Sequence, residues 1–293
     1  MKTFLYIFSF LFLHSLFCQD DIFLPNSKDS VEIIHHSFFH LGYSEHHEQA
    51  LWVAYELTNE ELYGKVERTN NFREDPSVTT GSATLTDYKN SGYDRGHLIP
   101  AADLSFDELA MNESFYLSNM SPQVPSFNRG IWKSLEEQIR YWTLALRKLY
   151  IITGPIILES DLKIGANEVS VPAYFYKVLY CQDSSQAIGF IMENKSGNQD
   201  LLTYSVDVDS VEFMSGLDFF PQLDTMLQNQ LESTFSEVFW LSLTSQVPMI
   251  ATPTPAQPSK NAICQGITES GNQCKRKVSQ GEKHCWQHRN TQD

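Results

Sequence analysis

The sequence predicts an α+β domain built on a core sheet, and three observations support this prediction. First, 293 residues, 42% of them hydrophobic and 13% aromatic, are enough to bury a sizeable core. Second, residues 128–149 have the pattern of an amphipathic helix packed on a core. Third, three β-rich runs follow this helix and predict the core sheet, at residues 149–157, 171–181 and 187–194.

The remaining elements are predicted in chain order. Residues 19–44 are polar and mixed, and we interpret them as a loosely held N-terminal arm. Residues 51–58 are apolar and rich in β-forming residues, which predicts a strand. Residues 107–119 are predicted to be helical early and extended late. Residues 221–235 are predicted to form a helix with Pro221 in its first turn, where proline is tolerated.

The main domain is predicted to span residues 45–246. Residues 247–260 are rich in Pro and Thr and have no periodicity, which predicts a linker. Residues 261–293 then form a small C-terminal module.

The N-terminus has the layout of a secretory signal peptide over residues 1–18. One Lys precedes an apolar run that ends at Cys18, and polar residues follow. Phe17 stands before Cys18, where a lipoprotein signal has small residues, so lipidation is not expected. No later segment has the length and apolar character of a membrane span. The leader therefore predicts a secreted or periplasmic protein.

The formal net charge of −15 argues against a nucleic-acid partner, because phosphate binding is driven by cationic surface. The local distribution can overrule this argument, since basic residues gather between positions 68 and 148. They are Arg68, Arg73, Arg95, Arg129, Lys133, Arg140, Arg147 and Lys148.

The stretch "SGYDRGHLIPAAD", residues 91–103, is the first candidate for chemistry. A single His such as His97 is more often structural than catalytic, but its neighbours change that balance. Arg95 is a fixed cation suited to a phosphate or a carboxylate, and Gly96 lets the backbone approach a ligand closely. The structural alternative is a buried salt bridge between Asp94 and Arg95.

The second candidate stretch contains Asn119, Asn128 and Glu136. An Asn carbonyl is a hard oxygen ligand of the kind that Mg²⁺ prefers. On a regular helix Glu136 lies about 80° around the axis and about 12 Å along it from Asn128, so it can reach a shared ion only through water. The structural alternatives are a helix cap for Asn128 and an i,i+4 pair between Glu136 and Arg140.

Together these two stretches resemble the DNA/RNA non-specific endonuclease family, the ββα-metal nucleases of the Serratia and endonuclease G type. The resemblance covers residues 45–240 and is supported by the motifs "NNFREDPSV", "TGPI" and "GLDFFP". It implies a ββα-metal fold with a central antiparallel sheet flanked by helices.

The resemblance also implies the roles of the site residues. His97 is then the general base, Asn128 the direct Mg²⁺ ligand and Glu136 a group that reaches the ion through water. Asn119 helps to hold this geometry. Arg95 and Arg129 bind substrate, and an upstream Arg assists catalysis, for which Arg68 is preferred to Arg73.

The implied activity is Mg²⁺-dependent hydrolysis of DNA and RNA that leaves 5′-phosphate ends, with Mn²⁺ as a possible substitute. The chemistry agrees, because a neutral His can take a proton from water and one divalent cation can stabilise the charge on the phosphate. Two alternatives remain open: a catalytically inactive nucleic-acid-binding module, and a phosphodiesterase of small nucleotides. The sequence leaves the oligomeric state open, a homodimer included.

The C-terminal module contains a set of candidate zinc ligands, Cys264, Cys274, Cys285 and His288, and it resembles small Cys₃His modules. Thiolate and imidazole suit a closed tetrahedral Zn²⁺ site, and a segment this short cannot fold on apolar burial alone. A disulfide with a spare thiol is the alternative, and His284 is an alternative ligand. Cys181 lies in a β-rich run and is predicted to be a buried free thiol.

Overall fold

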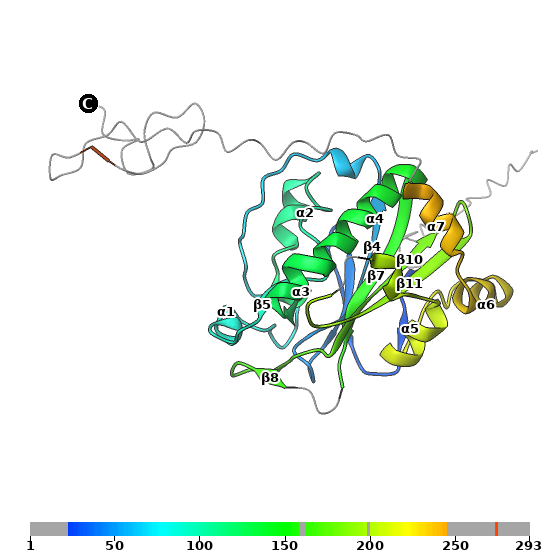
Figure 1. Cartoon of the computed structure of the whole chain (residues 1–293). Coiled ribbons are helices and arrows are strands. Elements are labelled where there is room, and N and C mark those ends of the chain that lie inside the picture. Colours follow the sequence, from blue (N-terminus) through cyan, green and yellow to red (C-terminus); the bar gives the residue numbers. More distant parts are fainter. Residues whose placement is uncertain (1–22, 159–161, 198–199, 245–272, 275–293) are drawn as a thin grey trace, which may run out of the picture. The chain divides into compact units, whose positions relative to one another are not determined.

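A computed structural model describes residues 23–158, 162–197, 200–244 and 273–274 of the chain. The chain divides into two compact units, residues 1–246 and 247–293. All the elements below belong to the first unit (Figure 1). No helix in the described ranges has the length and apolar character needed to span a membrane.

A seven-stranded sheet forms the centre of the first unit, in the order β12-β11-β10-β7-β4-β3-β2. Every neighbouring pair is antiparallel. The strands are β2 (Glu32–His35), β3 (His40–Ser44), β4 (Gln49–Thr58), β7 (Lys148–Ile156), β10 (Tyr174–Cys181), β11 (Gln186–Glu193) and β12 (Ser205–Val206). The central strands are buried on both faces, which explains why their sequences are continuously apolar.

Helices cover both faces of this sheet (Figure 1). One apolar core contains side chains of α2 (Glu108–Glu113), α4 (Lys133–Leu146) and α7 (Glu237–Thr244). The core on the opposite face contains side chains of α5 (Val208–Ser215) and α6 (Thr225–Ser233). The predicted α+β fold with a central antiparallel sheet and flanking helices is therefore confirmed.

The other elements are short. Three two-stranded pairings join β1 (Asn26–Ser27) to β13 (Leu217–Asp218), β5 (Asp94–His97) to β6 (Met120–Gln123), and β8 (Lys163–Ile164) to β9 (Val169–Ser170). The short helices are α1 (Leu85–Tyr88) and α3 (Pro125–Phe127), with 3₁₀ turns η2 (Glu61–Tyr63), η3 (Leu117–Asn119) and η5 (Leu201–Tyr204).

The β5–β6 pair and the helix that follows it form a ββα unit on the α4 side of the sheet. In this pair Asp94 lies opposite Gln123, and His97 lies opposite Met120. The chain then passes through α3, a π-helical turn η4 (Asn128–Trp132) and α4. Gly130, within the turn, has φ −110° and ψ −113°, outside the helical region.

The boundaries of two predicted helices are wrong. The helix expected over residues 128–149 begins earlier, with α3, and ends at Leu146 because Arg147 adopts a positive φ of 71°. Residues 148 and 149 already belong to β7. Pro221 lies outside α6, which begins after Asp224, whose carboxylate accepts a hydrogen bond from the Met226 amide at 3.0 Å.

The prediction of a loosely held arm is wrong for residues 32–44. These residues form β2 and β3, which extend the central sheet from β4. The mixed composition of this segment did not indicate strands, because few side chains of β2 are buried in the core: Ile34 is 4% exposed and Ile33 is 52% exposed.

Several predicted features lie outside the described residues: the leader at 1–18, the linker at 247–260, and most of the C-terminal module. Of its predicted zinc ligands only Cys274 is described, and it is buried. Cys181 is a buried free thiol in β10, as predicted.

Truncating Ile34 to Ala should lower the free energy of unfolding by about 2–4 kcal/mol, because it leaves a cavity under β2. The matched Ile33→Ala variant removes the same atoms from an exposed position and should change stability by less than about 0.5 kcal/mol. Urea denaturation of both variants measures this. Equal effects of the two substitutions would mean that β2 contributes no core.

Candidate active site

A cleft of about 390 Å³ opens beside the ββα unit. It brings together most of the residues singled out from the sequence. The lining residues include Arg68, Arg95, His97, Asn128, Arg129 and Glu136. Asn119 and Arg73 do not line it. Thus side chains from the loop before α1, from β5 and from the η4–α4 helix meet at one place.

His97 forms the inner wall of the cleft and is 9% exposed. Its ring contacts Phe72 and Phe115 edge-on, with ring centroids 5.6 Å and 5.0 Å away, and the two phenylalanine rings contact each other. Nε2 is completely buried and has no hydrogen-bond partner within the described part of the chain. Nδ1 is therefore the ring nitrogen that can accept a proton from water in the cleft.

Two arginines stack on the same two phenylalanine rings. The Arg68 guanidinium stacks over Phe115 at 4.8 Å, and the Arg95 guanidinium stacks over Phe72 at 4.2 Å. Stacking on an aromatic face holds a guanidinium without using its N–H donors. Both arginines therefore keep donors available for an anion in the cleft beside His97.

Burial lowers the pKa of His97 to about 3, and the positive charges of Arg68 and Arg95 act in the same direction. The imidazole is therefore neutral at physiological pH, which is the form that can accept a proton.

Asn119 is fully buried and lies behind His97. Its side-chain carbonyl accepts from the Ile99 amide at 3.0 Å, and its Nδ2 donates to the Ile99 carbonyl at 3.1 Å. Its backbone carbonyl accepts from the Leu98 amide at 3.0 Å. Nδ2 also donates to the Ser114 carbonyl at 2.9 Å. Asn119 thus fixes the backbone that follows His97 and does not enter the cleft.

Asn128 is held by Asp94 across the ββα unit. Its Nδ2 donates to Asp94 Oδ2 at 2.9 Å, so its amide has one orientation and its Oδ1 remains available to a ligand. The Arg129 guanidinium donates to both oxygens of Asp94, with Nε to Oδ2 at 2.8 Å. The alternative Asp94–Arg95 salt bridge is absent from the described contacts: Asp94 binds Asn128 and Arg129 instead.

The cap interpretation of Asn128 is wrong, because the residue has α-helical φ and ψ angles and directly continues α3. The regular-helix angle between Asn128 and Glu136 does not apply either, because the non-helical φ and ψ of Gly130 form a kink between Asn128 and α4. Asn128 and Glu136 both line the cleft.

Glu136 makes no ion pair with Arg140 in the described structure. Arg140 instead donates to Asp103 Oδ1 at 2.7 Å, and Asp103 Oδ2 accepts from the Tyr55 hydroxyl at 2.9 Å. Burial raises the pKa of Glu136, while the charges of Lys177 and Arg140 oppose this shift. The i,i+4 alternative from the sequence is thus not what the structure shows.

The cleft is basic although the chain as a whole is acidic. Its lining contains one carboxylate, Glu136, and five cations: Arg68, Arg95, Arg129, Lys133 and Arg140. Three of these cations, Arg129, Lys133 and Arg140, come from the η4–α4 segment and line the cleft. The net charge of −15 therefore describes the rest of the surface and not this site.

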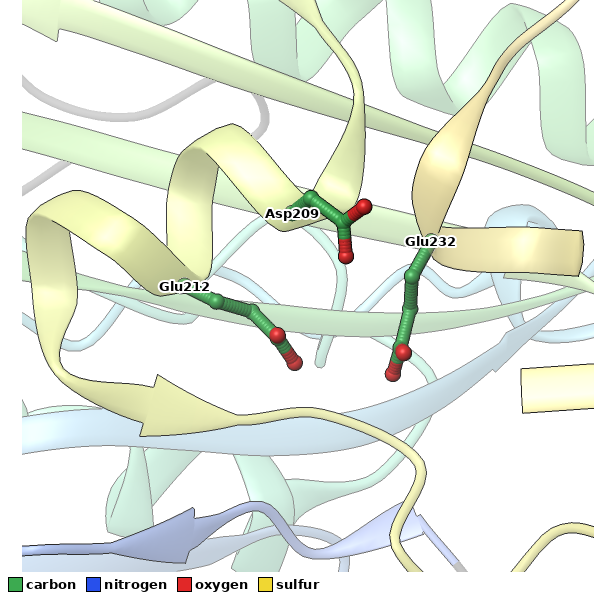
Figure 2. A group of neighbouring side chains, drawn as sticks. All are labelled: Asp209, Glu212 and Glu232. Atoms are coloured by element: carbon green, nitrogen blue, oxygen red, sulfur yellow. The ribbon is translucent and has the colours of Figure 1, made fainter. Parts of the chain in front are cut away.

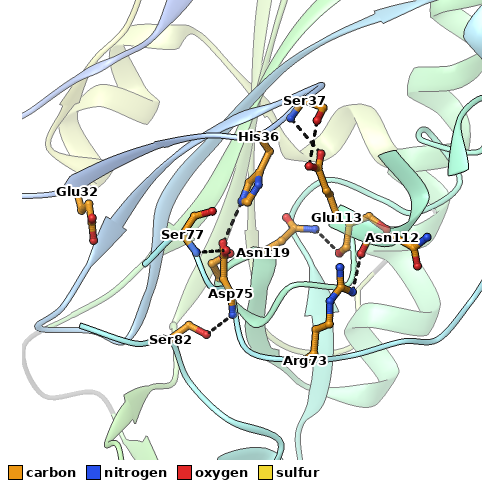
Figure 3. Close-up of polar contacts among 12 residues, drawn as sticks. Glu32, His36, Ser37, Arg73, Asp75, Ser77, Ser82, Asn112, Glu113 and Asn119 are labelled. Carbon is orange, nitrogen blue, oxygen red and sulfur yellow. Dashed lines mark hydrogen bonds and ion pairs between the residues drawn. The ribbon is translucent and has the colours of Figure 1, made fainter. Parts of the chain in front are cut away.

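The loop that carries Arg68 and Phe72 is anchored by buried polar contacts (Figure 3). His36 Nε2 lies 2.9 Å from Asp75 Oδ2, and the Ser118 hydroxyl donates to the same carboxylate. Arg73 donates to the Asn112 carbonyl at 2.9 Å and stacks over Tyr116 at 4.0 Å. Arg73 therefore fixes this loop to α2, while Arg68 enters the cleft.

Three residues that the sequence reasoning missed contribute to the site. Phe72 and Phe115 contact His97, and the fully buried Lys177 donates to the carbonyl of Leu98, directly after His97. The signal for Lys177 was available, since it is the one basic residue in the apolar run "VPAYFYKVLYC". No sequence signal connects the two phenylalanines to His97.

A second group of acidic side chains, Asp209, Glu212 and Glu232, lies on α5 and α6 (Figure 2). The Glu212 carboxylate already accepts from the Phe219 amide at 2.6 Å. Burial and then the charge of Glu212 raise the pKa of Glu232 to about 8, so its carboxyl holds a proton at neutral pH. A protonated carboxyl explains the close approach without an ion, and we assign no metal site here.

A family model described as DNA/RNA non-specific endonuclease matches residues 23–226. The chain belongs to the DNA/RNA non-specific endonuclease family. The prediction of an enzyme of the endonuclease class is therefore confirmed at the level of the family. The match begins at residue 23 and therefore includes most of the predicted arm, residues 19–44. This agrees with the presence of β2 and β3 in the central sheet.

Named nucleases of this family are similar to much of the chain. Mitochondrial endonuclease G of Homo sapiens is 39% identical over 191 residues, which are 59% of this chain and 64% of that protein. Nuclease C1 of Cunninghamella echinulata var. echinulata is 37% identical over 203 residues, which are 63% of this chain and 81% of the relative. The chain thus spans somewhat less than two thirds of human endonuclease G.

A solved structure shares the fold. The crystal structure of the EndoG/EndoGI complex superimposes with a TM-score of 0.61 and 34% sequence identity. The match covers 66% of this chain and 86% of the other. The predicted ββα-metal nuclease fold is confirmed by this likeness.

The predicted secreted or periplasmic location is contradicted by the comparisons. Human endonuclease G and the EXOG nucleases of Xenopus laevis and Mus musculus are named as mitochondrial proteins. The prediction depended on residues 1–18 alone, whose apolar run identifies an export signal only by its general pattern. Those residues lie outside the described ranges, so no structural feature supports the prediction.

We expect the His97 ring signals in NMR to show no titration between pH 8 and about 4, because the pKa lies near 3 and not at the ordinary 6.5. In that interval the unfolded chain binds a proton that the folded chain does not. His97 should therefore lower stability as pH falls from 6.5, by up to about 1.4 kcal/mol per pH unit.

The variant His97→Gln assigns the signal and removes this contribution, so its stability should fall less steeply with acid than that of the wild type. A ring that titrates near pH 6.5 would contradict the described burial.

Proposed function

We propose that this chain hydrolyses phosphodiester bonds in DNA and RNA with the help of a divalent cation, Mg²⁺ or Mn²⁺. The observation that carries the proposal is the cleft itself, which is lined by a neutral His97, by Asn128 with its amide bound to Asp94, and by two stacked arginines. Membership of the endonuclease family supports the same conclusion.

The residues present fit a divalent cation. Asp94 orients the Asn128 amide so that its Oδ1, a hard oxygen donor, is available. Glu136 lines the same cleft and would hold the ion through water. When bound, such a cation would supply positive charge to the phosphate and to the departing 3′ oxygen.

The protein side chains would perform the other steps. His97 takes a proton at Nδ1 from the attacking water, and its Phe72–Phe115 surroundings hold the ring in one orientation. Arg68 and Arg95 bind the non-bridging oxygens of the phosphate and stabilise the charge that builds there. Attack opposite the 3′ oxygen leaves a 5′-phosphate and a 3′-hydroxyl.

The cleft is suited to a polymer without a fixed sequence. Its cations recognise phosphate, which carries little base information, so we expect slight sequence preference. Arg129 already binds Asp94 at both oxygens, and we propose that its contribution to substrate is through charge at the edge of the cleft.

The purified chain should cleave supercoiled plasmid and single-stranded RNA in Mg²⁺ and lose both activities in EDTA. His97→Ala should lower kcat by about 10²–10⁴-fold, because it removes the general base. Gel analysis of products and 5′-end labelling measure the rates and the end chemistry.

Retention of nucleic acid without cleavage by the wild-type chain in either metal ion would favour a binding module. Cleavage of dinucleotides but not of plasmid would favour a phosphodiesterase of small nucleotides.

Arg68 and Arg73 offer a matched pair of substitutions. Arg68→Met should lower kcat/KM by about 10²-fold, because it removes a phosphate-binding cation. Arg73→Met should lower the melting temperature and change kcat/KM of the folded enzyme by less than about threefold, since its donors hold the Asn112 carbonyl. Plasmid cleavage and thermal melting of both variants check this. The reverse order of effects would assign the catalytic role to Arg73.

A further inference from the structure

Lys177 is a buried cation that the proposed mechanism does not use. It lies in the middle of β10, between Phe175 and Leu179, which belong to the core on the α4 face. Its relative exposure is 0%. A buried ammonium is costly unless its donors are satisfied, so its contacts indicate why it is present.

The ammonium makes three contacts, and each belongs to a different element. Nζ donates to the Thr153 hydroxyl of β7 at 3.1 Å. It also donates to the Leu98 carbonyl, directly after His97, at 3.3 Å. The third contact is with the Trp132 ring of the π turn, whose centroid lies 4.5 Å away. Trp132 is four residues after Asn128 in that turn.

The segment after His97 is therefore held from two sides. Asn119 binds the Leu98 amide and both backbone groups of Ile99. Lys177 binds the remaining polar group, the Leu98 carbonyl. Lys177 also contacts Trp132, in the same turn as Asn128. It therefore connects the segment after His97 and the turn that carries Asn128 to the central strands β7 and β10.

We propose that Lys177 is a positioning residue of the nuclease site, which fixes His97 relative to Asn128 by joining the Leu98 carbonyl and the Trp132 ring to the central sheet. This inference rests on the proposed function. It concerns geometry, because a displacement of about 1 Å between reacting groups can lower a rate by about 10²-fold. The long lysine stem reaches from β10 to both elements, and its charged end binds a carbonyl and an aromatic face together.

The test is Lys177→Met, which keeps the length of the side chain and removes the charge and the donors. We expect kcat to fall about tenfold or more with KM unchanged, because substrate binding by the surface arginines is retained. The melting temperature should stay within a few degrees of the wild type or rise, since an apolar residue replaces a buried charge. The ¹³C signal of the Leu98 carbonyl and the His97 ring signals should shift.

The matched control is Lys148→Met. Lys148 is a half-exposed lysine of the neighbouring strand β7, where it pairs with Glu56 at 3.2 Å. This variant should leave kcat and the Leu98 signal unchanged. A kcat of Lys177→Met within twofold of the wild type, or an equal fall in Lys148→Met, would overturn the proposal.

A second variant and the NMR signals distinguish the remaining outcomes. If Lys177→Met does not fold, Thr153→Val removes one acceptor of the ammonium at nearly constant shape. It should lower kcat about threefold and shift the Leu98 carbonyl signal, and wild-type values for both would overturn the proposal.

If the wild type shows no cleavage, the proposed function fails. The Leu98 and His97 signals of Lys177→Met then still decide whether Lys177 positions this segment.

Discussion

The site depends on the hydrogen bonds that Asn119 makes with the backbone after His97. A histidine at the end of a short strand would otherwise move with the loop that follows it, and its ring would not keep one position against the cleft. The buried side-chain amide of Asn119 binds both backbone groups of Ile99, and its backbone carbonyl accepts from the Leu98 amide. Because these groups are buried, breaking any one of them leaves an unsatisfied polar atom, which keeps the arrangement in place.

Around this fixed point the chain collects positive charges. Five cations line a cleft in a chain of net charge −15. Arg129 and Arg140 pair with carboxylates, while Arg68 and Arg95 lower the pKa of His97. Aromatic rings stabilise two of these cations, because the faces of Phe115 and Phe72 attract the guanidiniums of Arg68 and Arg95. The same cations that would bind a phosphate therefore act together with burial to keep the imidazole neutral.

The kink at Gly130 has a comparable part in the other half of the site. It lies between Asn128 and α4, and Asn128 and Glu136 both line the cleft. Asp94, from β5, orients the Asn128 amide. A local departure from regular helical geometry therefore separates the two oxygen donors of the site along the chain.

The sequence by itself determined the fold class, the core strands β4, β7, β10 and β11, the long helix and the family, because these depend on periodicity and on the local motifs around His97 and Asn128. Only the tertiary structure decided the rest. It placed β2 and β3 in the sheet, Arg68 and not Arg73 in the cleft, and Arg129 on Asp94. It also brought Phe72, Phe115 and Lys177 to the histidine from positions far apart along the chain. Such contacts depend on which elements pack together in space, and no spacing along one segment encodes them.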